Sequence, residues 1–272
     1  MRETIAARDA SDAELLRVHT PPYLELVERE TSAAQTPRYL STGDAVVDAR
    51  SLAAARRAAG GAVAAMEAAV EENASVFALI RPPGHHAEPD RGMGFCLFNN
   101  IAVAARAFLA SHGGRVLVVD FDYHHGNGTQ AVAGDGLSYV GTHAAPAYPG
   151  TGGGEPNETQ RGSDVIANVP LPVGGIATER FVSIWDALLP RIAAQVRPDL
   201  ILVSAGFDYV AGDPVGDLGI GVEAASALGE RIAAVAAEYC KNRVVYVLEG
   251  GYDLDALTES IARIAAASDA SR

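Results

Sequence analysis

Two stretches of the sequence carry adjacent histidines, and each follows a short apolar run. RPPGHHA places His85 and His86 after the run VFALI, and VVDFDYHHGNG places Asp120, Asp122 and His124 at intervals of two residues. In an extended segment, alternate side chains point to the same side, so a carboxylate and an imidazole at this spacing can hold one metal ion. The alternative is a strand that simply ends in polar residues. That reading is weak because so many titratable groups are costly without solvent or partners.

Two further stretches place polar groups after apolar runs. SAGFDYVAGDP brings Asp208 after LILVS, and LEGGYDL brings Tyr252 after VVYVL. With Asp208, the carboxylates and His124 form a three-ligand set that leaves one position open, as catalytic zinc sites do. The same ligands also suit Fe(II) or Co(II). The phenol of Tyr252 can donate a hydrogen bond to a developing oxyanion, although a tyrosine packed beside a turn is the plainer reading of that residue alone.

The elements around these stretches predict how they meet. Short β-branched runs alternate with longer helical patterns, which is typical of a mostly parallel sheet with helices on both faces. We expect strands at 76–80, 116–120, 137–143, 168–171, 200–204 and 244–248. We expect helices at 44–72, 99–111, 178–196, 221–239 and 255–267. Gly60 and Gly61 weaken the middle of the first, and Pro190 is expected to kink the third. A capping box of Ser11 and Glu14, and Thr20 before Pro21, mark two further helix starts. Because ligands bind at the carboxyl ends of parallel strands, the polar stretches are expected at one rim of the sheet.

This set of groups suits metal-assisted hydrolysis of an amide. A bound metal would polarise the carbonyl and acidify water, and a neutral histidine would pass a proton to the leaving amine. Asp120 and Asn127 lie near the proposed metal ligands Asp122 and His124 in the sequence, so they can orient His85 and His86. A carboxylate partner keeps its histidine charged, whereas an amide partner leaves the other histidine more readily neutral, as a general base must be.

Composition limits the domain count and the partners. The chain has 272 residues, 49% of them hydrophobic, and shows no repeat or linker, so we expect one domain over 1–272. The net charge of −13 argues against a nucleic-acid partner. There is no apolar run of membrane-spanning length, no signal-like start, and no CxxC around Cys96 or Cys240. We therefore expect a cytoplasmic protein without a membrane partner, and a homo-oligomer is left open.

Six motifs together resemble the histone deacetylase superfamily, which includes bacterial deacetylase-like amidohydrolases, acetoin-utilisation proteins and acetylpolyamine amidohydrolases. Over residues 12–262 they occur in the order RPPGHHA, GFCLFNN, VDFDYHHGNGTQ, YPGTG, SAGFDYVAGDP and LEGGY. The resemblance implies an α/β, three-layer arginase/deacetylase-like fold in a single domain. It also implies a zinc-dependent amidohydrolase for linear amides, which removes an acyl group, acetyl above all, from an acyl-lysine peptide or another small amine. Asp122, His124 and Asp208 match the zinc ligands of that family.

The same resemblance assigns roles to the other polar residues. His86 matches the general base and acid, and His85 matches an electrostatic partner beside Asp120. Tyr252 matches the oxyanion donor. Asn127 in HHGNG is similar to the class II branch, where class I members have Asp.

Positions around the substrate tunnel both match the family and depart from it. Gly94, Phe95 and Tyr148 match residues that line a narrow tunnel for the acyl chain. At the same rim, Val215 stands where polyamine-selective relatives can carry a glutamate, which weakens the case for a polyamine substrate. Gly141 stands where many deacetylases have a serine that helps hold a monovalent cation such as K⁺, so that cation is left open. The chain is also short at its N-terminus, so we expect an edge element and part of the rim to be missing.

Other functions account for fewer residues. A cysteine hydrolase using Cys96 would leave the carboxylates unexplained, and an arginase-like two-metal enzyme would need a carboxylate at position 126, which is glycine. A nucleotide-binding loop at 150–158 lacks the lysine of a P-loop, so we expect a flexible loop there. An acyl-lysine binder that keeps the fold without turnover, and an ester or polyamine deacylase, stay as alternatives.

The histidines outside these motifs have structural readings. His19 and His112 are expected to be solvated or to cap helices, and His125 to make a structural hydrogen bond. His143 is expected either to support the site or to pack. Asp213 is expected to be a turn residue because it lies among Gly and Pro.

Overall fold

The computed structural model describes residues 4–270 and is built around a seven-stranded sheet. The strands are ordered β3-β9-β8-β4-β5-β7-β6, and neighbours are parallel except at the antiparallel β6–β7 edge. The strands are β3 (Ser75–Ala78), β4 (Val116–Asp120), β5 (Leu137–Ala145), β6 (Asn157–Arg161), β7 (Asp164–Pro172), β8 (Leu200–Ala205) and β9 (Val244–Leu248). The expected mostly parallel sheet is confirmed.

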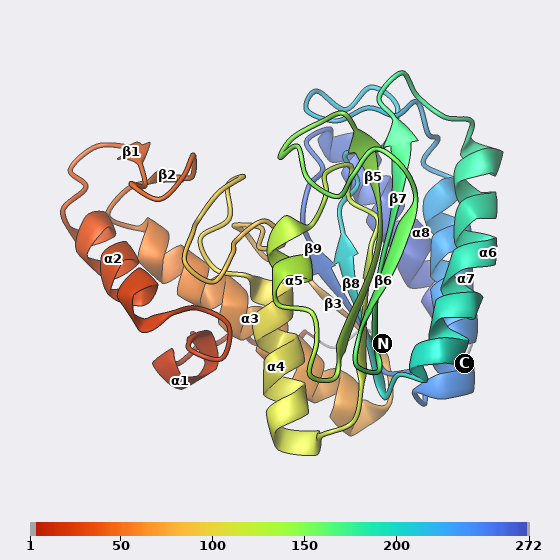
Figure 1. Ribbon diagram of the computed structural model, residues 1–272, viewed down its shortest axis with the longest axis horizontal. Helices are drawn as coiled ribbons and strands as arrows, with labels where there is room; N and C mark the ends of the chain where they lie inside the picture. The colour runs from red at the N-terminus through yellow and green to blue at the C-terminus, as the bar shows by residue number, and fades with distance from the viewer. Residues whose placement is uncertain (1–3, 271–272) are drawn as a thin grey trace.

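Helices cover both faces of the sheet (Figure 1). One face carries α3 (Ser51–Glu72) and α4 (Asn100–His112), and the other carries α6 (Thr178–Val196), α7 (Ala224–Tyr239) and α8 (Leu254–Ala270). The shorter helices are α1 (Asp12–Leu15), α2 (Pro21–Ser32) and α5 (Asn127–Ala131). No described helix is both long enough and apolar enough to cross a membrane. The expected three-layer α/β architecture is confirmed.

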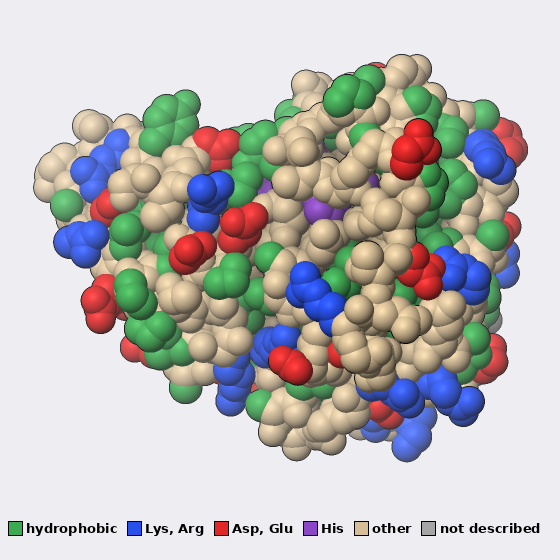
Figure 2. All heavy atoms as spheres, in the orientation of Figure 1, with side chains coloured by type: hydrophobic (Ala, Val, Ile, Leu, Met, Phe, Trp, Pro, Cys, Tyr) green, Lys and Arg blue, Asp and Glu red, His purple; other side chains and the backbone are tan. Residues whose placement is uncertain are grey.

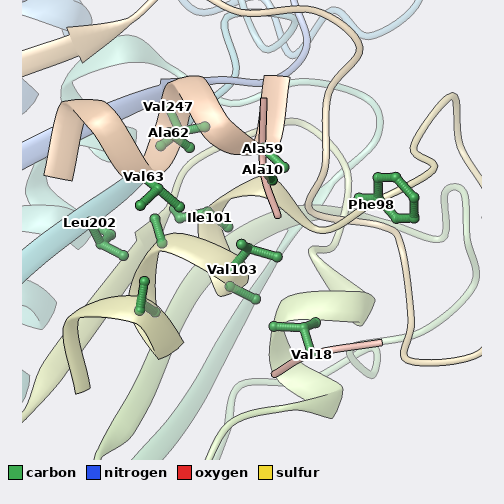
Figure 3. Packing of buried hydrophobic residues seen from close by; sticks show 14 of the residues in the cluster. Ala10, Val18, Ala59, Ala62, Val63, Phe98, Ile101, Val103, Leu202 and Val247 are labelled. Carbon is green, nitrogen blue, oxygen red and sulfur yellow. The ribbon is translucent and has the colours of Figure 1, made fainter. Parts of the chain in front are cut away.

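Each face of the sheet has its own hydrophobic core. Along β4, Val116 and Val118 belong to the core under α3 and α4, whereas Leu117 and Val119 belong to the core under α6 and α7. This alternation follows from the period of two along a strand. The small residues of α3 let it lie close to α4 and the sheet, and Figure 3 shows Ala59, Ala62 and Val63 among them.

Gly60 belongs to this close packing. A Cβ atom there would overlap the backbone of Arg8, which runs across α3 in the segment whose Ala10 N–H donates to Arg56 O at 2.8 Å. The sequence pattern suggested that Gly60 weakens the middle of the helix. The helix is continuous, and its glycine instead lets the N-terminal segment approach.

Several helix signals are confirmed. Ser11 and Glu14 form the expected capping box at the start of α1. Pro21 begins α2, although Thr20 makes no side-chain cap. α6 runs over the expected residues, with Pro190 inside it.

Other expectations were wrong at their boundaries. The helix expected from position 44 begins at Ser51, because the β-branched Val46 and Val47 form β2 (Val46–Val47), which pairs with β1 (Arg38–Tyr39). The segment 157–161, expected to be loop, is the edge strand β6. All of its residues are exposed, so it has no apolar alternation that would mark it as a strand.

Candidate active site

The four polar stretches follow four neighbouring strands of the sheet. In the order β3-β9-β8-β4, these strands lead to the His85–His86 pair, Tyr252, Asp208 and Asp122 with His124. Their carboxyl ends meet at one rim, as expected. Figure 2 shows the surface hollowed, with histidine side chains visible at the bottom of the hollow.

Three side chains at this rim form a candidate metal site. One ligand atom each from Asp122, His124 and Asp208 lies within 4.8 Å of the others. His124 Nδ1 is 3.1 Å from Asp122 Oδ1 and 3.0 Å from Asp208 Oδ2. A single ring nitrogen cannot donate its one proton to both oxygens, and the buried Oδ2 of Asp208 has no well-formed hydrogen bond. Two carboxylate oxygens and an imidazole nitrogen gathered in this way fit a divalent cation.

The remaining carboxylate oxygens are anchored to the backbone. Gly250 N–H donates to Asp122 Oδ2 at 2.9 Å, and Tyr123 N–H donates to Asp208 Oδ1 at 3.0 Å. A Cβ atom at position 250 would run into both carboxylates, so only glycine allows this approach. The ligands are therefore held in place by the chain itself.

Electrostatics at this cluster also favour a cation. Burial and the neighbouring Asp122 raise the pKa of Asp208. Burial opposes ionisation of Asp122 as well, but His85 and His124 outweigh it and lower that pKa. Two buried carboxylates this close together need positive charge between them.

The two adjacent histidines have different partners. His85 Nδ1 lies 3.2 Å from Asp120 Oδ2, and His86 Nδ1 lies 2.8 Å from Asn127 Oδ1. For His85, burial would lower the pKa, but the charges of Asp122 and Asp120 outweigh it and raise the pKa to about 10. For His86, burial and the charge of His85 both lower the pKa, well below its usual value. The two partners differ, a carboxylate for His85 and an amide for His86, and the pKa shifts of the two histidines run in opposite directions.

Two glutamates that the sequence analysis missed hold this pair. Asn127 Nδ2 donates to Glu88 Oε1 at 2.8 Å, which turns the amide oxygen toward His86. His86 Nδ1 must then donate, so its Nε2 is the free, basic nitrogen. Glu249 Oε2 accepts from Gly84 N–H at 2.7 Å and His85 N–H at 3.1 Å, which holds the backbone of the pair. A carboxylate two residues after His86, in HHAE, was the available signal for Glu88.

Aromatic side chains surround the entrance. The ring of Tyr148 lies 5.2 Å from that of His86, and the ring of Phe95 lies 6.2 Å from that of Tyr252. Phe95 and Tyr148 are 56% and 38% exposed, so they can meet a ligand from solution. Asp44, placed in a helix by the sequence pattern, instead lies between β1 and β2 and accepts from Gly94 N–H at 2.9 Å and Tyr148 Oη at 3.2 Å. Val215 is exposed in the loop after β8.

Tyr139 fills the space beside Gly141. Its hydroxyl donates to Asp120 Oδ2 at 3.3 Å and would lie 2.7 Å from a Cβ atom at position 141. A serine there would crowd this hydroxyl. Gly141 itself supplies no side-chain oxygen for a monovalent cation.

The expectation for His19 was wrong. This side chain is 2% exposed; its Nδ1 donates to Glu88 O at 3.1 Å, and its Nε2 accepts from Asn99 N–H at 2.9 Å. His112 is exposed, as expected. His125 makes structural hydrogen bonds to Thr151 Oγ1 and Gln130 Oε1, at 2.7 and 2.9 Å. His143 is buried and packs with its ring 4.9 Å from that of His125.

Comparisons with known proteins place this geometry in a family. The histone deacetylase domain family matches residues 1–268. Histone deacetylase HDA1 of Saccharomyces cerevisiae is 34% identical over 275 residues, which cover 96% of this chain and 38% of that protein. The probable deacetylase of Archaeoglobus fulgidus is 35% identical over 249 residues, which cover 90% of this chain and 68% of that protein.

A bacterial relative and a solved structure agree with this placement. The histone deacetylase-like amidohydrolase of Pseudomonas aeruginosa is 39% identical over 253 residues, which cover 91% of this chain and 65% of that protein. The crystal structure of the HDA15 HD domain is similar with a TM-score of 0.86 at 34% identity, over 96% of this chain and 74% of that one. This chain thus spans between 38% and 68% of the length of the three curated relatives named. The family match runs over almost the whole chain, and the chain belongs to the histone deacetylase family.

Proposed function

We propose that this protein is a zinc-dependent amidohydrolase that removes an acyl group, above all acetyl, from a lysine-like or other amine. The single observation that carries the proposal is the cluster of Asp122, His124 and Asp208 within 4.8 Å, beside two histidines with opposite pKa shifts. The names of the relatives, which are deacetylases and an amidohydrolase, support the same reaction class.

Asp122, His124 and Asp208 would hold the metal, with Fe(II) or Co(II) as alternatives to zinc. When bound, the metal would supply Lewis-acid polarisation of the carbonyl and a more acidic water. The side chain of His124 keeps 12% of its surface exposed, so the cluster is open on one side. The ring of Tyr148, at the entrance, lies 6.2 Å from that of His124.

His86 would act as the general base and then as the acid. Its Nδ1 is engaged by Asn127, so Nε2 would take the proton from water and return it to the leaving amine. The lowered pKa of His86 keeps Nε2 neutral at neutral pH. His85, paired with Asp120, would carry positive charge beside the reacting carbonyl.

Tyr252 would donate a hydrogen bond from its phenol to the developing oxyanion. Burial and the charges of Asp122 and Asp208 raise the pKa of this phenol, so the group stays protonated and can donate. Gly94, Phe95 and Tyr148 would line the passage for the acyl-bearing chain, with Val215 at its outer rim. At position 94 a side chain would strike the His86 ring, so glycine keeps this passage open.

The residues 1–272 would act as one catalytic domain, and a cytoplasmic location is part of the proposal. Cys96 and Cys240 are both buried and unpaired, which suits a reducing compartment. The partner we propose is the acylated amine itself, as a peptide or as a small molecule.

An assay of the zinc-loaded protein tests the function. Acyl-lysine peptides, acetylpolyamines and simple acyl esters would be offered with and without a chelator. We expect turnover of an acyl-lysine amide that stops on chelation and returns with zinc. Binding of acetyl-lysine without hydrolysis would favour the non-catalytic alternative, and hydrolysis of esters or polyamines alone would redirect the substrate class.

A further inference from the structure

Asp213 connects two loops of the rim through four backbone amides. Its Oδ1 accepts from Val215 N–H at 2.9 Å and Gly216 N–H at 3.1 Å. Its Oδ2 accepts from Tyr252 N–H at 2.7 Å and Asp253 N–H at 3.1 Å. The residue is 6% exposed, so these bonds are shielded from water. One carboxylate thus ties the loop after β8 to the loop after β9.

We propose that Asp213 is a positioning residue that sets the place of the Tyr252 phenol, an inference that rests on the proposed role of Tyr252. The chain before Tyr252 offers little rigidity, because Gly250 and Gly251 precede it and Gly251 has a φ of +129°. Within residues 4–270 no hydrogen bond holds the phenol itself, whose ring contacts Phe95. The direction of the phenol must therefore come from its backbone, which Asp213 holds on one side.

The opposite side of the segment is held by a proposed metal ligand. Gly250 N–H donates to Asp122 Oδ2, and two residues later Tyr252 N–H donates to Asp213 Oδ2. The segment that carries Tyr252 is thus anchored by hydrogen bonds at both ends, to the candidate metal site before Tyr252 and to Asp213 at Tyr252. Loss of either anchor should let the phenol move, and a displacement of about 1 Å can cost about 100-fold in rate.

The carboxylates of Asp217 and Asp253, the neighbouring aspartates in the same two loops, accept hydrogen bonds only within their own loops. Asp217 Oδ1 accepts from Gly219 N–H at 2.8 Å, and Asp253 Oδ1 accepts from Asp255 N–H and Ala256 N–H at the start of α8. These contacts explain local turns and a helix cap. The bond from Asp213 to Tyr252 crosses 39 positions of the sequence, so it shapes the site rather than one turn.

The test uses Asp213→Asn, with Asp217→Asn as the matched control. The asparagine keeps the shape of the side chain but has only one accepting oxygen, so one pair of amides loses its partner. Amide hydrogen exchange of the zinc-loaded protein identifies that pair. In the control, the asparagine at exposed position 217 of the same loop keeps the one accepting oxygen that the bond from Gly219 N–H needs, so exchange and turnover should stay at wild-type values.

The kcat for an acetyl-lysine peptide should be lower in Asp213→Asn only if the amides of residues 252 and 253 exchange faster than in the wild type. If these amides exchange faster, we expect kcat to fall about 10- to 100-fold, with KM changed less than about threefold. In the Tyr252→Phe background the same substitution should change kcat less than about twofold, because the group it positions is gone. If the asparagine oxygen stays with the 252–253 amides, kcat should stay at the wild-type value.

Three results would overturn the inference in an active wild-type protein. They are faster exchange at 252–253 with unchanged kcat, slower turnover with those amides fully protected, and an equal loss of kcat in the Tyr252→Phe background. If Asp213→Asn unfolds, shown by thermal melting, Asp213→Glu is measured in the same way and judged by the same rule. A wild-type protein without turnover on any acyl amine would overturn the proposed function, and this inference with it.

Discussion

His85 and His86 are neighbours in the chain with ring centres 4.1 Å apart, yet the protein gives them opposite surroundings. Both are buried, which alone would lower the pKa of each. Carboxylates surround His85 and raise its pKa to about 10, whereas His86 meets an amide and the charge of His85. The difference teaches that the partner, rather than the depth of burial, decides which of two buried imidazoles is charged.

The amide partner is itself chosen by a neighbour. Asn127 Nδ2 donates to Glu88 Oε1, so an aspartate at 127 would bring two carboxylates together. Glu88 thus favours an amide at this position. The sequence shows that residue 127 is an asparagine, but the reason for an amide there is the hydrogen bond to Glu88, 39 positions away.

The largest expected effect is on His86. His86→Ala should lower kcat by about 10²- to 10⁴-fold, because the proton transfer loses its base. Elemental analysis should find zinc close to stoichiometric, since His86 is outside the ligand cluster. Normal turnover in this variant would show that His86 is not the base, so its contrast with His85 would have no role in the reaction.

His85→Ala should affect stability more than chemistry. Its removal leaves the fully buried Asp120 carboxylate without its imidazolium, and breaking a buried pair costs about 3–5 kcal/mol. Urea unfolding of the wild type and the variant, both zinc-free, measures this loss. An unfolding free energy within about 1 kcal/mol of the wild type would show that the pair is not charged as we infer.

His19 tests the same rule at a buried histidine that is not part of the ligand cluster. This buried histidine has only neutral partners, and burial lowers its pKa to about 4. As the pH falls from 6.5 to 4, the unfolded chain binds a proton that the folded protein refuses, so stability falls by about 3 kcal/mol. His19→Gln, which can keep both hydrogen bonds, should lack this part of the pH dependence.

Urea unfolding of both proteins across that pH range, with chelator present, isolates the contribution of His19. All other titrating groups are shared, so they cancel in the difference between the two curves. Parallel curves would mean that His19 titrates normally and that burial without a carboxylate does not lower its pKa.

The smallest expected effect is on the pH dependence of turnover. Asn127→Asp should raise the pKa of His86, so the acid limb of kcat/KM moves to higher pH and the rate on that limb falls about tenfold. Combining it with Glu88→Gln relieves the repulsion between the carboxylates and serves as the control for misfolding. An unmoved acid limb in the double variant would show that the partner does not tune His86.

Local sequence patterns predicted much of the fold. The apolar runs marked β4, β8 and β9 to the residue or within one, and the capping box and Pro190 helix were found where the pattern placed them. Hydrophobic periodicity is a local property, so it can be read directly. The exposed strand β6 and the hairpin β1–β2 were missed, because elements that bury little leave little pattern.

The sequence by itself determined which residue types stand after which strands, and hence that a metal-binding, proton-transferring rim was to be expected. Only the tertiary structure decided that β3, β9, β8 and β4 lie side by side and that His19 is buried. It alone also revealed the contacts of Asp44, Glu88 and Asp213. The physical reason is that strand order and long-range hydrogen bonds arise from packing the whole chain, whereas spacing along the sequence reports only on neighbours within one element.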